Sequence, residues 1–289
     1  MVNPSQICTL LPLEKDVNTQ ADYNSNRVIA DPSKCGHTGL RLAVSDRELD
    51  NIPSENLTQT GRGDNLWEIG QTIVMRLNGG SPSLRRKVIY YARIWEKYAN
   101  IHFRFLRRDS EVKDDVRILH VSFEQDKGNY SYIGTNALTV PRDKAIMNLA
   151  LNAYSSTREV RRKVLHEFGH LLGCIHEHSS PASSIPWNAA AVYEYYKARE
   201  GWGRQKIYHN VLRKFDKYNI SQFSDFDPKS IMIYPISESV LLPGNSEFVV
   251  PWNTRLSATD KEFIGKLYPF PEEPETPLAG MPVFQTTKD

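Results

Sequence analysis

The stretch VLHEFGHLLGCIHEH, Val164 to His178, limits how this chain can fold more than any other segment. It places four histidines and two glutamates inside an otherwise apolar run. His166 and His170 are four residues apart, so on a helix they project from one face, one turn above the other. Two imidazoles placed in this way can share one metal ion. The spacing predicts a buried helix that carries a metal site.

A third histidine completes the pattern if the helix ends in time. A helix that continued past His170 would carry His176 away from the first two imidazoles. Gly173 is the predicted helix end, because glycine adopts the left-handed helix-ending conformation without steric cost. His176 then returns to give three nitrogen ligands of the kind that bind zinc, with a fourth position open. Zn²⁺ is therefore the predicted cofactor, and an open position is typical of a catalytic site.

Glu167 is the candidate general base. It is adjacent to His166, and its carboxylate can lie beside the open metal position and accept a proton from water whose pKa zinc lowers to about 7. Two other interpretations stay open: a structural zinc site, and histidines that are merely satisfied within a core. Three ligands with an adjacent glutamate favour the catalytic interpretation.

Composition limits the classes of partner. The 289 residues are 40% hydrophobic, as expected for a globular protein with a core. The 36 basic and 34 acidic residues give a charge of +2, which indicates neither a nucleic-acid nor a membrane surface as main partner. The chain has three cysteines, Cys8, Cys35 and Cys174, which cannot form a disulfide framework and favour a reducing compartment. A Cys8–Cys35 pair stays open.

No targeting segment is recognisable near the start. The first twenty residues lack the basic start and the apolar core of a secretory signal, and no later run approaches the length of a membrane span. The expected localisation is cytoplasmic, with non-classical export as the alternative.

The pattern of residues divides the chain into three parts. Residues 1–65 are polar and rich in turns and are interpreted as an N-terminal extension, residues 66–270 as one domain, and residues 271–289 as a flexible proline-rich tail. Within the domain the patterns predict five strands, at 72–77, 101–106, 116–123, 129–138 and 145–151. They predict helices at 81–100, after Ser156 or Thr157, and at 188–200, 203–215 and 256–268, with no convincing sheet after residue 180.

Two motifs carry a resemblance to a known family. HEFGHLLGCIHE resembles the HExxHxxGxxHE zinc signature of metzincin metallopeptidases, and Glu177 after the third histidine is similar to the astacin-type branch. SIMIYP, Ser230 to Pro235, resembles the Met-turn of the same class. The resemblance implies that Met232 forms an apolar floor beneath the metal. It also implies that Tyr234 either ligates zinc loosely or donates a hydrogen bond to an oxyanion.

The resemblance, which runs from about Trp67 to Pro269, implies an α+β metzincin fold. This fold has a twisted mixed five-stranded sheet, a backing helix, an active-site helix and a less regular C-terminal part. The segment YSYIGTNA resembles the family's edge strand, which can pair with an extended peptide. The implied function is a zinc endopeptidase acting on a protein or peptide. The alternative is a zinc-containing peptide-binding protein without proteolytic activity, and the oligomeric state is not predicted.

The chain also departs from the family pattern. Astacin-type enzymes usually carry disulfides and a processed N-terminus that pairs with the glutamate after the third histidine, so Glu177 needs another partner here. Ile233 replaces a histidine often found in the Met-turn, and Cys174 replaces an aromatic residue. His178 is interpreted as a loop residue and not as a ligand. The other histidines outside the motif are interpreted as ordinary surface or core residues and not as site residues: His37, His102, His120 and His209.

The N-terminal extension carries two hypotheses for latency. Cys35 in SKCG can act as a cysteine switch, its thiolate occupying the open zinc position, and Asp64 in GRGD can do the same, as aspartates do in astacin propeptides. The alternative is that both are ordinary loop residues.

Overall fold

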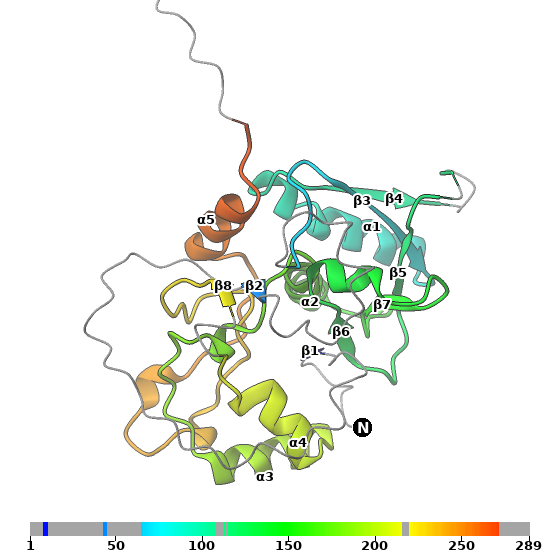
Figure 1. Cartoon of the computed structure of the whole chain (residues 1–289). Helices are drawn as coiled ribbons and strands as arrows, with labels where there is room; N and C mark the ends of the chain where they lie inside the picture. The colour runs from blue at the N-terminus through cyan, green and yellow to red at the C-terminus, as the bar shows by residue number, and fades with distance from the viewer. Residues whose placement is uncertain are drawn as a thin grey trace, which may run out of the picture.

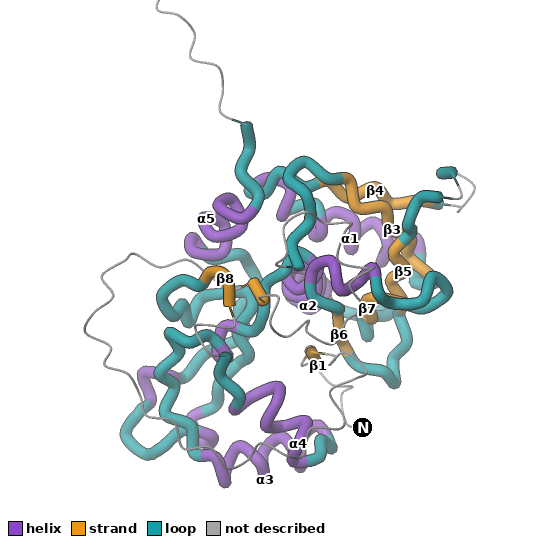
Figure 2. Tube along the Cα trace, viewed as in Figure 1, coloured by secondary structure: helices purple, strands orange, loops and turns teal. Residues whose placement is uncertain are grey.

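The computed structural model describes residues 8–10, 43–44, 65–107, 112–113, 115–215 and 220–271. In Figure 1 a sheet with its helices forms the upper half of the molecule, and a less regular half lies below it. Figure 2 shows that helices and strands dominate the upper half, whereas loops dominate the lower half. The fold is thus the predicted α+β arrangement in two parts.

The main sheet is mixed and has the order β1-β6-β7-β5-β3-β4 among the described residues. Its strands are β1 (Cys8–Leu10), β3 (Thr72–Asn78), β4 (His102–Leu106), β5 (Leu119–Ser122), β6 (Asn129–Ser131) and β7 (Ala145–Asn148). β4, β3, β5 and β7 run parallel, and β6 is antiparallel to β7. The five predicted strands are all present, and helix α1 (Pro82–Ala92) makes the parallel crossover from β3 to β4.

The predicted edge strand is shorter than expected and is not the outermost strand. β6 ends at Ser131, and a 3₁₀ helix (Gly134–Leu138) follows within the segment expected to be strand. β1 pairs with the outer side of β6 in parallel register, with Cys8 opposite Asn129 and Leu10 opposite Ser131. The main-chain groups predicted to receive an extended peptide are thus paired with the chain's own N-terminal segment.

Serine side chains start the two helices that pack beside the sheet. α1 (Pro82–Ala92) begins after Ser81, whose hydroxyl accepts the N–H of Leu84. A 3₁₀ turn (Trp95–Lys97) follows it, so the helix predicted over 81–100 ends early. α2 (Thr157–Leu171) begins after Ser156, which is therefore the cap rather than Thr157.

The C-terminal half is built from short elements. They are α3 (Ala189–Glu200), α4 (Arg204–Ile207), a π-helical turn (Tyr208–Leu212), β8 (Ile220–Gln222) and α5 (Ala258–Leu267). β8 pairs with β2 (Ala43–Val44), so the prediction of no sheet after residue 180 is wrong for one small ladder. The helix predicted over 203–215 is broken, because α4 passes into the π turn after Ile207.

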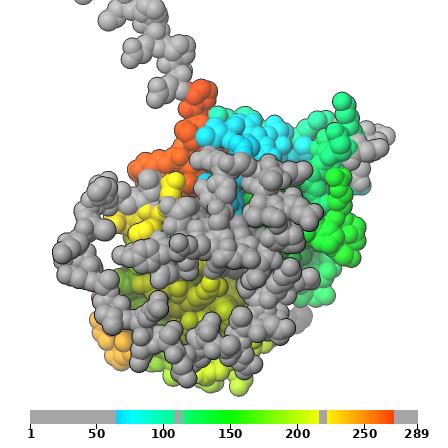
Figure 3. All heavy atoms as spheres, in the orientation of Figure 1, coloured from blue at the N-terminus to red at the C-terminus, as the bar shows by residue number. Residues whose placement is uncertain are grey.

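Two hydrophobic cores underlie the two halves. The sheet core packs the sheet against α1, α2 and α5 and includes Met75, Val88, Phe168 and Ile264. The lower core includes Val192, Tyr196, Val211 and Ile236. Figure 3 shows that the chain returns to the upper half at α5 (red-orange), after residues that belong to the lower half. Within the described ranges, no helix is both long enough and apolar enough to cross a bilayer.

Candidate metal centre

Helix α2 presents the first two histidines from the centre of the protein. The segment from Val160 to Leu171 is almost wholly buried, so His166 and His170 face the interior from one side of the helix. Gly173 has φ +96°, and a Cβ placed on it would lie 2.7 Å from Cδ2 of Leu66. The prediction that glycine ends this helix is confirmed, and the space allows no side chain there.

The end of α2 is held by two aromatic residues. The indole N–H of Trp67 donates to the carbonyl of Leu171 at 2.6 Å, and the hydroxyl of Tyr268 donates to the carbonyl of Leu172 at 2.9 Å. Both carbonyls lie past the last hydrogen-bonded turn and would otherwise be buried without a partner. The chain can therefore leave the helix abruptly and bring His176 back toward the first two imidazoles.

The three predicted ligands converge. Candidate ligand atoms of His166, His170 and His176 all lie within 4.8 Å of one another, and Nε2 of His166 is 3.2 Å from Nε2 of His170. Two nitrogens bound to one tetrahedral zinc at about 2.0–2.1 Å each would lie roughly 3.3 Å apart. The observed separation fits a shared zinc ion.

Hydrogen bonds fix which ring nitrogens are free. Nδ1 of His166 lies 2.8 Å from the carbonyl of Ile231, and Nδ1 of His170 lies 2.7 Å from the carbonyl of Cys174. A carbonyl only accepts, so Nδ1 carries the proton in both rings and the two Nε2 lone pairs face each other. Both ring nitrogens of His176 are buried without a hydrogen-bond partner. A cation bound between the rings would satisfy all of these lone pairs.

Burial keeps the three rings neutral. It lowers the pKa of His170 to about 4 and the pKa of His166 and His176 well below the usual 6.5. The charge of His170 lowers the pKa of His166 and His176 further, and the cation of Arg162 acts in the same direction. Neutral imidazole is the form that binds a metal, so these side chains are ready to bind one at neutral pH.

The predicted Met-turn lies against α2. A Cβ on Gly169, in the turn between the two helical histidines, would lie 2.4 Å from Sδ of Met232 and 3.2 Å from Trp95. Met232 is buried, which agrees with the role of an apolar floor. Sequence reasoning overlooked Gly169, although a glycine within an apolar helix is a recognised signal of close packing.

Tyr234 lies beside the histidines together with a fourth imidazole. Its ring centroid is 4.4 Å from that of His176 and 4.5 Å from that of His178. His178 also stacks on His176 at 5.0 Å with an interplanar angle of 17°. His178 is no member of the ligand cluster, as predicted, but it is buried and packs on two site residues, which the sequence analysis did not foresee.

The two glutamates of the motif are both buried. Glu167 is 1% exposed and Glu177 is 3% exposed. Glu177 has the other partner that the sequence required: its Oε1 accepts the backbone N–H of Asp227 at 2.8 Å. Its own N–H donates to the carbonyl of Met232 at 3.1 Å. Glu177 therefore joins the segment after the third histidine to the Met-turn and to the loop that precedes it.

Of the three remaining residues singled out in the sequence, Cys174 lies within the described part of the chain, and Cys35 and Asp64 do not. Cys174 is buried, and its backbone carbonyl orients the ring of His170. Cys35 and Asp64, the two latency candidates, lie outside the described residues.

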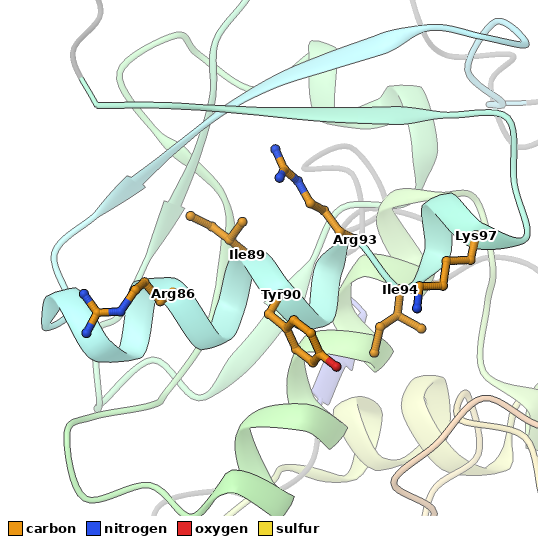
Figure 4. Close-up of a pocket in the computed structure, with 6 residues that line it drawn as sticks. All are labelled: Arg86, Ile89, Tyr90, Arg93, Ile94 and Lys97. Atoms are coloured by element: carbon orange, nitrogen blue, oxygen red, sulfur yellow. The ribbon is translucent and has the colours of Figure 1, made fainter.

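A separate hollow of about 460 Å³ lies on the outer face of α1 (Figure 4). Its lining residues are Arg86, Ile89, Tyr90, Arg93, Ile94 and Lys97. They include no histidine, cysteine or carboxylate. The hollow therefore offers none of the metal-binding or carboxylate groups that gather at the three histidines.

Comparison with solved structures places this arrangement in a family. A structure of myroilysin is 39% identical over 72% of this chain and 97% of that chain, with a TM-score of 0.66. This chain belongs to the astacin family of zinc metallopeptidases. A second myroilysin structure is 34% identical over 81% of this chain and 100% of that chain, with a TM-score of 0.52. The hatching enzyme zinc-protease HCE-1 of Oryzias latipes (medaka fish) is 19% identical over 70% of this chain, with a TM-score of 0.48. No protein-family model and no curated protein sequence matches the chain.

Membership of the astacin family confirms the predicted fold and cofactor. The chain is a zinc-dependent endopeptidase, and the cluster of three histidines fits a zinc ion. The interpretations of a purely structural zinc site and of satisfied core histidines are thereby set aside.

Proposed function

We propose that this astacin-family endopeptidase cleaves protein or peptide chains with Glu167 as general base and then general acid, and with Tyr234 as oxyanion donor. The convergence of three neutral buried imidazoles beside Glu167 and Tyr234 supports this proposal most directly. A zinc ion held by His166, His170 and His176 would supply Lewis-acid chemistry, lowering the pKa of water and polarising the scissile carbonyl.

The location of Glu167 on α2 supports its assignment as the base. It follows His166 directly on α2, so its side chain leaves the helix from the adjoining face and remains buried. A carboxylate in this position can accept a proton from the attacking water and later deliver it to the leaving amine. A glutamine in its place would keep the size of the side chain but could not take the proton.

The contacts of the Tyr234 ring support its assignment as the oxyanion donor. Its ring lies 4.4 Å from the His176 ring and 6.3 Å from the His166 ring, measured between centroids. A phenol O–H beside the metal ligands can donate to the oxygen on which negative charge develops, and removing one such donor costs about 10²–10³ in kcat. The other role implied by the family resemblance, loose ligation of zinc by Tyr234, is tested by the same substitution.

The proposed roles are tested by digesting an unfolded protein mixture and identifying the products by mass spectrometry. Glu167→Gln should abolish cleavage while the protein keeps its zinc, and Tyr234→Phe should lower kcat by about 10²–10³. Loss of zinc from Tyr234→Phe would instead indicate ligation. Full cleavage by Glu167→Gln would contradict the assignment of the base.

Membership of a family of zinc endopeptidases disfavours the alternative of a peptide-binding protein without activity. Such a protein would retain peptides with and without Glu167, and it would cleave none of them.

We further propose that residues 1–65 are regulatory and that residues 66–270 form the catalytic domain, with 271–289 as a tail. The pairing of β1 with β6 supports this, because it engages the main-chain groups that an extended peptide would use. Thr9→Pro in the full chain should disrupt this short ladder, because proline has no N–H and fixes φ, and should raise the initial rate of cleavage. An unchanged rate would argue against a regulatory role for β1.

The two latency candidates are distinguished in the same full-length protein. Cys35→Ser should activate the enzyme if its thiolate occupies the zinc, and Asp64→Asn should do so if the carboxylate does. If activity is unchanged in both variants and also after removal of residues 1–65, neither residue is a switch.

A further inference from the structure

We propose that Arg162 is a positioning residue that sets the orientation of Tyr234 by holding the peptide unit directly before it. The inference rests on the proposed role of Tyr234. Arg162 lies on α2, one turn before His166, and is only 5% exposed.

The guanidinium of Arg162 joins two separate segments. Nη2 donates to the carbonyl of Ile233 at 3.0 Å, and Nη1 donates to the carbonyl of Asn253 at 2.7 Å. The group also lies over the ring of Trp252, with its carbon 4.3 Å from the centroid. The planar guanidinium is therefore fixed by hydrogen bonds along its edge and by an aromatic ring on its face.

These contacts continue to the start of the Met-turn. The side-chain amide of Asn253, whose carbonyl Arg162 holds, donates to the carbonyls of Pro228 at 2.8 Å and Ser230 at 3.0 Å. Arg162 thus controls the end of the turn directly and its beginning through Asn253.

The carbonyl of Ile233 belongs to the same planar peptide unit as the nitrogen of Tyr234. Fixing the direction of that carbonyl fixes the plane from which the backbone of Tyr234 departs, and hence the direction of the phenol. The two cores also meet at this point, because Ile231 and Met232 pack in the sheet core whereas Ile233 and Tyr234 pack in the lower core. Rotation of this one peptide would move Tyr234 relative to the histidines on α2.

The chemistry of the side chain supports a positioning role over simple packing. A buried cation is costly, and an apolar residue of similar volume often fills such a space at no loss of stability. Arginine differs from lysine in presenting several donors in a fixed plane, so it can hold two carbonyls of different segments at once. A lysine in this position keeps the charge and most of the length but lacks the planar set of N–H donors.

The test uses the zinc-loaded full chain with Arg162→Lys, Arg162→Met and a matched control, Arg158→Met. Arg158 is an exposed arginine on the first turn of the same helix. All proteins are labelled with 3-fluorotyrosine, and the ¹⁹F signal of Tyr234 is assigned as the one missing from Tyr234→Phe. Arg162→Lys and Arg162→Met should shift or broaden this signal, and Arg158→Met should leave it in place.

Kinetics provide the second readout. Arg162→Lys should lower kcat by roughly ten- to a hundredfold, the scale expected for a displaced catalytic group, while KM changes little. In the Tyr234→Phe background the same substitution should change kcat less than about twofold, because the group being positioned is gone.

Two results would overturn the inference: a Tyr234 signal that stays in place in both Arg162 variants, or an equal loss of kcat with and without the Tyr234 hydroxyl. Failure of the proposed function has a different signature. If Tyr234→Phe alone keeps the wild-type kcat, the oxyanion role is wrong, and the ¹⁹F signal still decides whether Arg162 positions the ring.

Discussion

Asp260 on α5 holds the backbone of Ile231, whose carbonyl in turn orients the first zinc ligand. Oδ2 of Asp260 accepts the N–H of Ile231 at 2.8 Å, and the Ile231 carbonyl accepts Nδ1–H of His166 at 2.8 Å. Oδ1 of Asp260 accepts the hydroxyl of Ser230 at 2.9 Å. The C-terminal helix therefore supports the metal site through the Met-turn.

Replacement of Asp260 should destabilise the protein. Its carboxylate is 1% exposed and also accepts the N–H of Ser257 in a capping box at the start of α5. Asp260→Ala leaves these donors buried without a partner, which costs about 1–3 kcal/mol for each affected group. We expect a lower urea midpoint at unchanged slope, with Asp260→Asn losing less because it keeps one acceptor oxygen.

Glu262→Gln is the control for this prediction. Glu262 is on the same helix but forms an exposed pair with Lys266, which solvent screens and which therefore contributes little to stability. An equal shift of the urea midpoint in Asp260→Ala and Glu262→Gln would contradict the role given to Asp260.

Sequence reasoning identified the local part of this site. The spacing of His166 and His170 follows from helix geometry, and the position of Gly173 follows from the conformation that ends a helix, so both could be derived from neighbouring residues. The groups that orient the histidine rings could not be derived in this way. Ile231 and Asp260 are distant in sequence, and nothing in their local pattern indicates that they meet His166 in the fold.

The sheet shows the same limit. Alternating apolar residues predicted each strand of the catalytic region, because side-chain periodicity is a local property. The partner of β6 was missed, because Cys8–Leu10 is a short segment in a polar region and only its pairing with β6 makes it a strand. His178 was likewise interpreted as a loop residue, since its burial depends on Tyr234 and Asn210, which come from other segments.

Gly169→Ala should weaken the packing beneath the metal. Alanine favours a helix over glycine by about 1 kcal/mol, but its Cβ would lie 2.4 Å from the buried sulfur of Met232. Overpacking of this kind costs about 1–3 kcal/mol, so we expect a lower melting temperature. In a Met232→Ala background the contact with the sulfur is absent and the 3.2 Å contact with Trp95 remains, so the same substitution should lower the melting temperature less. A rise in both backgrounds would contradict the close contact.

Substitutions of Glu177, the glutamate after the third histidine, distinguish two possible partners of its carboxylate. In this structure its Oε1 accepts a hydrogen bond from the N–H of Asp227 at 2.8 Å, and the side-chain oxygen of glutamine can accept the same bond. Glu177→Gln should therefore stay close to wild type in melting temperature, and Glu177→Ala should lose about 1–3 kcal/mol. If the carboxylate pairs instead with a charged, processed N-terminus, Glu177→Gln will lose stability as well.

His178 should contribute to catalysis by packing its ring on His176 and Tyr234 rather than by binding the metal. Burial lowers its pKa to about 4, and Nε2 lies 2.8 Å from the carbonyl of Asn210. His178→Ala removes the ring that stacks on His176 and Tyr234, and we expect kcat to fall by about tenfold with zinc retained. His178→Phe keeps an aromatic ring and should restore most of kcat. Loss of zinc from His178→Phe would show that this imidazole acts as a ligand.

Removal of zinc should lower the stability of the folded protein. Without a cation, the Nε2 lone pairs of His166 and His170 face each other at 3.2 Å, and both nitrogens of His176 are buried without a partner. A ligand that binds only the folded state at a hundred times its Kd stabilises it by about 2.7 kcal/mol. For a domain of this size, that corresponds to roughly 5–11 °C in melting temperature. Calorimetry of the chelator-treated Glu167→Gln protein, with and without added zinc, measures this shift without self-digestion. His176→Ala in the same background should lose most of the shift, and an equal zinc-dependent rise in both proteins would contradict the assignment of His176 as a ligand.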